Sequence, residues 1–238
     1  MKRLHLLTFA AFALFSIASY GQTSISPLPY YINSPGTYVV ATDLSVGGIA
    51  ILINSANVTL DFNGHILTCT NPLGSIGVVV NQVRNVRIKN GTLTGFLFGI
   101  VFNNPSQIAA NNSGHFVEEM HITQFPRIGI EADNATGCVI QNNYVNAGNN
   151  FSAIGIEVSG AATGNLLESG NLVLRNQVLN CNAGIVSAGQ ITNNYFESNV
   201  VYGCIHGFEL GNDKCRFNTT VDCVTPFRGG ILLTDQNN

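Results

Sequence analysis

One short phrase constrains the fold of this chain more than any other feature of its sequence. A glycine is followed by an apolar residue, then by a variable residue, and then by a residue that is nearly always apolar. The phrase recurs at intervals of 22 to 30 residues, and its glycines are Gly48, Gly77, Gly99, Gly129, Gly155, Gly184, Gly207 and Gly230. A repeat of this length indicates a fold assembled from stacked, equivalent units.

The residues inside each phrase alternate in polarity, which is typical of a β-strand with one buried face. A second type of segment follows most of the phrases and combines an alternating apolar run with asparagine, as in residues 57–64, 85–91 and 191–195. Each repeat is therefore expected to contain at least two short strands joined by turns rich in Asn and Gly. No stretch of the chain has a convincing helical period.

Short strands that repeat without helical connections predict an all-β fold. The expected architecture is a single-stranded, right-handed parallel β-helix, which is a solenoid of about eight coils. The thirty asparagines fit this architecture, because stacked Asn side chains can hydrogen-bond from one coil to the next. An antiparallel sandwich is the alternative, but its strands would not need to share one register.

Two further segments point to a known group of proteins. They are residues 34–40, which read SPGTYVV, and residues 58–65, which read VTLDFNGH. Together with the glycine phrase, they resemble secreted right-handed parallel β-helix repeat proteins of the pectin-lyase-like superfamily, over about residues 25–238. The resemblance implies the fold and a polysaccharide or oligosaccharide partner. It does not extend to enzyme motifs, because Arg87-Ile88-Lys89 is similar to a polygalacturonase motif but lacks the Asn-Thr-Asp, Asp-Asp and Gly-His-Gly partners of that family.

The amino terminus predicts export. Residues 1–3 begin a basic segment, residues 6–18 are apolar, and small residues precede a cleavage point near Gly21 and Gln22. We therefore expect a signal peptide at 1–21, an N-terminal cap segment at 22–46 with irregular strands, and the β-helix domain at 47–238. The mature protein should be secreted or periplasmic, and no later apolar run is long enough to span a membrane.

The charge balance excludes one class of partner. Without Lys2 and Arg3, eight Lys and Arg remain against 13 Asp and Glu, a formal charge of −5. A nucleic acid is therefore not an expected partner, because no basic stripe is available to displace phosphate counterions. An anionic polysaccharide would need a bridging calcium ion, which is the only cofactor that the sequence suggests.

The variable residues of the phrases should point outward and form one flat column along the solenoid. In chain order this column is predicted to contain Ala50, Val79, Val101, Glu131, Glu157, Val186, Glu209 and Leu232. Glu131, Glu157 and Glu209 are candidate catalytic carboxylates on one face. Asp133, which points outward on the same strand as Glu131, and Arg127 and His206, which stand just before two of these strands, are candidate substrate-binding residues. The long insertions at 105–115 and 160–171 are expected to form walls around them.

The acidic face leaves three classes of function open: a polysaccharide lyase or hydrolase, a non-catalytic carbohydrate-binding module, and a structural or surface protein whose solenoid is only a spacer. Neighbouring carboxylates suit a glycoside hydrolase or, with Arg127, a polysaccharide lyase. Glu131, Asp133 and Glu157 could instead supply oxygen ligands to calcium. A non-catalytic surface protein, either a carbohydrate-binding module or a spacer, is the alternative, and in that case the carboxylates are only a solvated face. The absence of Trp disfavours the aromatic platforms of a binding module, but the sequence leaves open whether the protein is an enzyme.

The cysteines and the carboxyl terminus give two more expectations. Cys181 and Cys204 each lie three residues before a phrase glycine, so adjacent coils should bring them within reach of a disulfide bond. A stack of reduced core cysteines is the alternative. The last coil, with Ile231 and Leu233, has no evident cap, and it is expected to find a partner, for example in a homo-oligomer.

Overall fold

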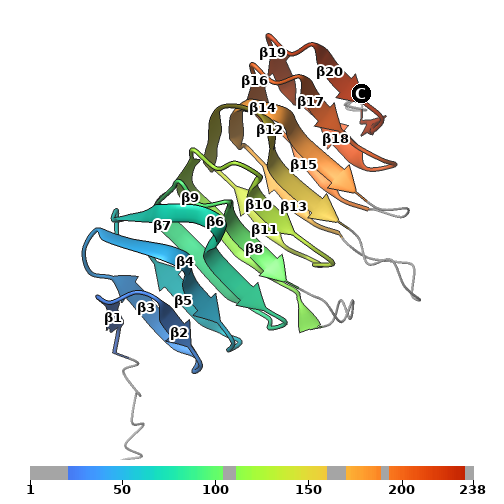
Figure 1. The fold of residues 1–238 in the computed structure, drawn as a ribbon. Coiled ribbons are helices and arrows are strands. Elements are labelled where there is room, and N and C mark those ends of the chain that lie inside the picture. Colours follow the sequence, from blue (N-terminus) through green and yellow to red (C-terminus); the bar gives the residue numbers. More distant parts are fainter. Residues whose placement is uncertain (1–20, 104–110, 160–169, 189–192, 234–238) are drawn as a thin grey trace, which may run out of the picture.

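The computed structural model describes residues 21–103, 111–159, 170–188 and 193–233. The predicted signal peptide lies almost wholly outside these residues, and so do most of the two long insertions expected around the acidic face. Within the described residues the chain forms 21 β-strands that pair in parallel. Strands that lie far apart in sequence stack in chain order along one axis, which makes the molecule a parallel β-helix (Figure 1).

Each complete coil contributes strand segments to three columns, where the sequence predicted at least two. The first column consists of β2 (Tyr30–Ile32), β8 (Phe98–Asn103), β10 (Ile128–Ala132), β17 (His206–Glu209), β20 (Thr225–Arg228) and the second halves of β4 (Leu44–Ile53), β6 (Ile66–Asn81), β12 (Tyr144–Ser159) and β14 (Gln177–Ala188). This column contains most of the glycine phrases.

The other two columns complete the coils. The second column contains β1 (Thr23–Ile25), β3 (Gly36–Val40), β5 (Val58–Asp61), β11 (Val139–Gln141), β13 (Leu172–Leu174), β15 (Tyr195–Glu197), β18 (Lys214–Arg216), β21 (Ile231–Leu232) and the first halves of β7 (Val86–Thr94) and β9 (Phe116–Thr123). The third column contains β16 (Val200–Tyr202), β19 (Thr219–Val221), the first halves of β4, β6, β12 and β14, and the second halves of β7 and β9.

The predicted register is confirmed through the middle of the molecule. Ile130 pairs with Ile156, and Ile156 pairs with Ile185. All three side chains are completely buried and belong to one continuous hydrophobic core that runs along the axis. Stacking is thus what removes these equivalent apolar side chains from water.

The register at the two ends differs from the prediction. In the first phrase Ala50 is buried, and Leu52 takes the outward place opposite Val79. The last phrase belongs to another column, because Ile231 pairs with Lys214 in the second column. Arg228 is the residue that follows Glu209 in the first column. The chain therefore turns through its last coil in fewer residues than the glycine spacing indicated.

The glycine of the phrase is required by a lack of space. A Cβ atom on Gly184 would lie 2.7 Å from the carbonyl oxygen of Gly207 and still closer to Cγ1 of Val201. A Cβ atom on Gly155 would meet the Gly184 carbonyl oxygen at 2.6 Å and Val178 in the same way. Each glycine thus lets one coil approach the next and leaves room beside its backbone for a core side chain. This explains why glycine recurs in the phrase.

Buried asparagine ladders connect the coils, as the composition predicted. Asn143, Asn176, Asn199 and Asn218 occupy the turn between the second and third columns. In each step a side-chain Oδ1 accepts from the backbone N–H and the Nδ2 group of the preceding asparagine, at 2.9–3.0 Å. Each Nδ2 group also donates to a backbone carbonyl at 2.8–3.0 Å. A second ladder of Asn171, Asn194 and Asp213 precedes the second column.

The ends of the solenoid differ in how they are covered. Residues 22–46, which we expected to form irregular strands, instead include strands that pair in register with the next coil. At the other end Val224 is 80% exposed and Leu232 is 70% exposed. The predicted partner for this end stays a prediction. Among the described residues, no helix is long and apolar enough to cross a membrane.

Candidate functional site

The outward-facing residues on the first column of strands include two glutamates that lie side by side. Val101 pairs with Glu131, Glu131 with Glu157, and Glu157 with Val186. Because neighbouring parallel strands are about 4.8 Å apart, the two carboxylate-bearing backbones lie one strand spacing from each other. Alternation directs Ile130 and Ala132 into the core, so Glu131 must point outward. The predicted pairing of Glu131 with Glu157 is therefore present.

Burial and like charge make this pair unusual. Both side chains are half-buried. Desolvation, followed by the negative charges of Glu157 and Asp133, raises the pKa of Glu131 to about 7. Desolvation and the charge of Asp133 also raise the pKa of Glu157, while the positive charge of Arg127 opposes both shifts. Near neutral pH the pair consequently holds a proton that an ordinary glutamate would have lost.

Two more of the predicted residues adjoin the pair. Asp133 accepts hydrogen bonds from Oγ of Ser159 at 2.8 Å and from Nδ2 of Asn134 at 2.9 Å, so its carboxylate is held in place. Arg127 is exposed, and its guanidinium lies 5.2 Å from the ring centroid of Phe98. Ser159 was not predicted, because a single serine at the end of a strand has no distinguishing sequence signal.

Glu209 and His206 do not join this cluster. Val186 separates Glu209 from Glu157, so two strand spacings, about 10 Å, lie between the backbones. Glu209 instead lies 3.3 Å from Nη1 of Arg228 and 3.6 Å from Nδ1 of His206. The sequence missed Arg228, since it assigned this place in the column to Leu232. The predicted face thus consists of two separate groups. Glu131, Asp133 and Glu157, with the adjacent Arg127, form what we call the acidic group. Glu209 forms the other group with His206 and Arg228.

The calcium interpretation gains no support from this geometry. Within residues 21–103, 111–159, 170–188 and 193–233, no three His, Cys, Asp or Glu side chains converge as a metal site. The carboxylate of Asp133 is engaged by Ser159 and Asn134. A calcium site formed by Glu131, Asp133 and Glu157 therefore stays a prediction.

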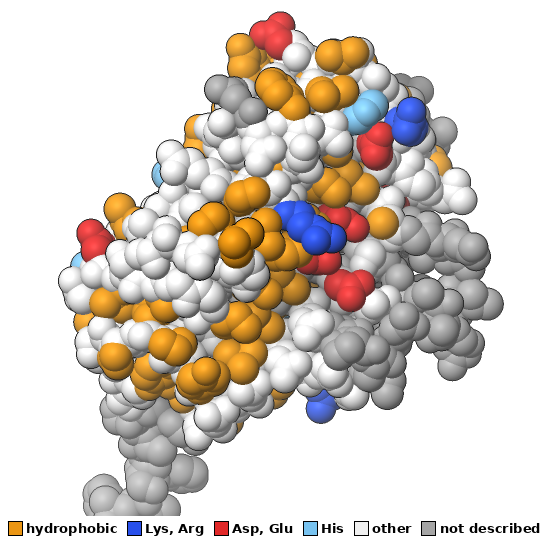
Figure 2. All heavy atoms as spheres, viewed as in Figure 1, with side chains coloured by type: hydrophobic (Ala, Val, Ile, Leu, Met, Phe, Trp, Pro, Cys, Tyr) orange, Lys and Arg blue, Asp and Glu red, His pale blue; other side chains and the backbone are white. Residues whose placement is uncertain are grey.

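An apolar strip leads along the same face to the acidic group. Leu52, Val79 and Val101 precede Glu131 in the outward column, and Val79 and Val101 are only 5% and 9% exposed. Figure 2 shows hydrophobic side chains gathered over the N-terminal coils of the visible face, with acidic and basic side chains beside them over the middle coils. In the outward column the acidic group thus follows two apolar side chains, Val79 and Val101, that are themselves almost completely buried.

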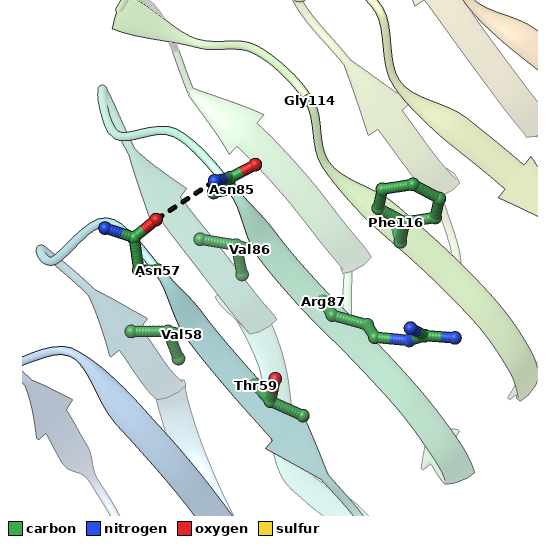
Figure 3. Close-up of a pocket in the computed structure, with 8 residues that line it drawn as sticks. All are labelled: Asn57, Val58, Thr59, Asn85, Val86, Arg87, Gly114 and Phe116. Atoms are coloured by element: carbon green, nitrogen blue, oxygen red, sulfur yellow. Dashed lines mark hydrogen bonds between the residues drawn. The ribbon is translucent and has the colours of Figure 1, made fainter. Parts of the chain in front are cut away.

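Other surface hollows lie on different columns. One of about 310 Å³ is lined by residues of β5, β7 and β9 together with adjacent turns (Figure 3). Its only charged side chain, Arg87, donates through Nε to Glu118 at 2.6 Å and stacks 5.7 Å from the ring centroid of Phe116. Another of about 420 Å³ contains His121, Tyr144 and Arg175. Neither of these two hollows includes the acidic group.

Comparison with known proteins returned nothing: no family model, no curated protein and no solved structure matches the chain. The candidate site is therefore argued from its own geometry.

Because the pKa of Glu131 is raised, we expect the stability of the folded protein to decrease as the pH rises. In the unfolded chain this carboxyl has a pKa near 4.5, and in the folded protein near 7. Between these values the folded state binds more protons, so raising the pH destabilises it; below pH 4.5 both states are protonated, and above pH 7 the penalty is constant. Glu131→Gln should therefore raise Tm at pH 8 by about 3 °C and leave Tm at pH 4 unchanged.

The matched control for this experiment is Glu209→Gln, which removes a carboxylate that is paired with Arg228. It should give no gain at pH 8. An equal gain from both substitutions in thermal melts would show that overall charge, rather than the local pair, sets the pH dependence.

Proposed function

We propose that this protein is an exported, pectin-lyase-like β-helix protein that binds and cleaves a polysaccharide at the acidic group. The observation that carries the proposal is the in-register pair of half-buried glutamates, one of which has a pKa raised to about 7. Export follows from the composition of residues 1–21. The pair belongs to a column of in-register strands from successive coils, which suits a ligand that is itself long and lies across several coils.

The pair is suited to glycoside hydrolysis. Retaining glycosidases place their two carboxyl groups about 5–5.5 Å apart, which is close to one strand spacing of about 4.8 Å. Glu131, which keeps its proton to near neutral pH, would donate it to the glycosidic oxygen as general acid. Glu157 would act as the carboxylate that stabilises or attacks the sugar, and Arg127 and Asp133 would orient sugar hydroxyl or carboxyl groups. Glu157 and Glu209 lie two strand spacings apart and would correspond to an inverting enzyme. This pair is less suited to catalysis than Glu131 and Glu157, because Glu209 is already paired with Arg228.

A non-catalytic surface protein is the second candidate. One observation favours it, because the two hollows described among the residues of the structure lie on other columns than the pair. In that case the acidic group would bind saccharide without cleaving it.

The test is the substitution Glu157→Gln, which preserves shape and removes one carboxylate. With the purified protein assayed on a panel of neutral and acidic polysaccharides for reducing ends and for unsaturated products, the variant should lose at least about 100-fold in activity. Glu209→Gln should retain activity, since Glu209 lies outside the pair. Binding with no cleavage by the unmodified protein would support the second candidate, and binding and activity that are both unchanged in Glu157→Gln would reject the site.

A further inference from the structure

Three cysteines form a column of their own at the C-terminal end. Leu179 pairs with Tyr202 and Ala183 pairs with His206, which sets Cys181 beside Cys204. The same reasoning applies one coil later. Tyr202 pairs with Val221 and His206 pairs with Thr225, which sets Cys204 beside Cys223. The sequence indicated only the first of these two adjacencies.

Both neighbouring pairs have a spacing suited to a disulfide bond. Adjacent parallel strands lie about 4.8 Å apart, within the range of about 4.4–6.8 Å that disulfides bridge between Cα atoms. All six cysteines are free thiols in the structure. The predicted Cys181–Cys204 bond and its alternative, a stack of reduced cysteines, both stay predictions for the protein in an oxidising compartment.

Accessibility separates the three thiols. Cys181 is completely buried and Cys204 is 2% exposed, whereas Cys223 is partly exposed. Cys223 belongs to the last coil, where its S–H group donates to the carbonyls of Val201 and Val221 at 3.7 and 3.5 Å. A reagent from solvent can therefore meet Cys223 more readily than the two deeper thiols.

The hydrogen bonds around Cys204 favour its thiolate. The backbone N–H of Cys181 donates to Sγ of Cys204 at 3.4 Å. Hydrogen bonding from the Cys181 thiol, together with this N–H, lowers the pKa of Cys204 despite its burial. The hydrogen bond to Cys204 and burial raise the pKa of Cys181, and burial raises that of Cys223. These contacts therefore favour the thiolate of the middle cysteine over those of its two neighbours.

We propose that Cys204 and Cys223 form a thiol–disulfide exchange site that closes a disulfide across the last two coils, with Cys181 as a reduced hydrogen-bond donor. The co-reactant is a small-molecule disulfide, RSSR. The Cys223 thiolate attacks RSSR, which forms a mixed disulfide and releases RS⁻. The Cys204 thiolate then attacks Sγ of Cys223 and expels the second RS⁻. In total two thiols are oxidised, one RSSR is reduced to two RSH, and two electrons are transferred.

The consequence is a covalent bond between the last coil and the coil before it. Within the described residues, β19 and β20 pair with one neighbouring strand each, and Phe227 is 44% exposed. Such a coil opens more readily than the interior ones. The disulfide joins its turn to β16 and β17, so oxidation should hold the end of the solenoid closed.

Peptide mapping decides which pair forms. The folded protein is incubated with oxidised glutathione, alkylated under denaturing acidic conditions, and digested with trypsin and with a glutamate-specific protease. Cleavage after Arg175, Glu197, Glu209, Arg216 and Arg228 places Cys181, Cys204 and Cys223 in separate peptides, 176–197, 198–209 and 217–228. We expect peptide 198–209 linked to 217–228. A link between 176–197 and 198–209, or no link in folded protein, would overturn the proposal.

Two variants and a second readout complete the test. The Cys181→Ser variant should still form the Cys204–Cys223 bond. The Cys223→Ser variant should form no disulfide, and its Cys204 should remain unmodified by glutathione. Tryptic cleavage of the native protein at Arg216 and Arg228 should be about tenfold slower after oxidation than before it, and oxidation should not change that rate in Cys223→Ser. Equal cleavage of the oxidised and reduced protein would show that the bond does not close the last coil.

Discussion

Replacing Asn176 with leucine is expected to lower the free energy of unfolding by at least about 4 kcal/mol, a large fraction of the about 5–15 kcal/mol by which ordinary proteins are stable. Asn176 is completely buried. Its Oδ1 accepts from N–H and Nδ2 of Asn143, and its Nδ2 donates to the Ile140 carbonyl and to Oδ1 of Asn199. Leucine fills a similar volume but leaves these buried groups without partners. Urea denaturation followed by circular dichroism measures the loss.

An exposed asparagine ladder supplies the control. Asn54 donates to Asn33 and accepts from Asn81, both at 3.1 Å, but its groups are in contact with water. Asn54→Ala should therefore change the free energy of unfolding by no more than about 0.5 kcal/mol. Asn176→Asp should lose at least as much as Asn176→Leu, because its second carboxylate oxygen would face two acceptors, the Ile140 carbonyl and Oδ1 of Asn199, in a completely buried position. If Asn176→Leu were as mild as Asn54→Ala, the buried ladder would contribute little to the fold.

The second large effect is expected from Gly184→Ala, at about 3 kcal/mol of lost stability. The added Cβ would lie 2.7 Å from the carbonyl oxygen of Gly207 and would overlap Cγ1 of Val201. The carbonyl belongs to the neighbouring coil and cannot move without disturbing the strand pairing. The same denaturation experiment measures this loss. Because the overlap raises the free energy of the folded state, the substitution should also shorten the lifetime of the folded protein.

Gly47→Ala is the matched control, because its Cβ would meet Thr70 and Asn71 at ordinary distances of 3.5 and 3.6 Å. It should be neutral or slightly stabilising. The double variant Gly184→Ala with Val201→Ala should recover only part of the loss, since the overlap with the carbonyl remains. Full recovery would mean that only side-chain crowding, and not the approach of the coils, requires the glycine.

Much of the fold could be predicted because it repeats. The glycine phrases from Gly77 to Gly207 lie in one register, and the buried asparagines form ladders, since equivalent positions on successive coils meet the same surroundings. The ends could not be predicted in this way. Gly48 and Gly230 match the phrase in letters, but the end coils differ in length, so the match does not fix which residue pairs with which.

The candidate site was predicted in part for the same reason. Register brought Glu131 and Glu157 together, because both lie within regular coils. Glu209 shares their column but pairs with Arg228, a contact that depends on the short last coil. Ser159 and Cys223 also depend on turns whose lengths vary, and no periodic signal marks them.

The sequence by itself determined the parallel stacking, the buried face of each strand and the column in which the glutamates stand, because alternation and period follow from backbone geometry. The tertiary structure alone decided which charges neutralise one another, which carboxylate keeps its proton and which thiols become neighbours. These properties depend on burial and on distances of a few ångströms between coils. Electrostatic energies change steeply over such distances, whereas the repeat pattern in the sequence does not specify these distances.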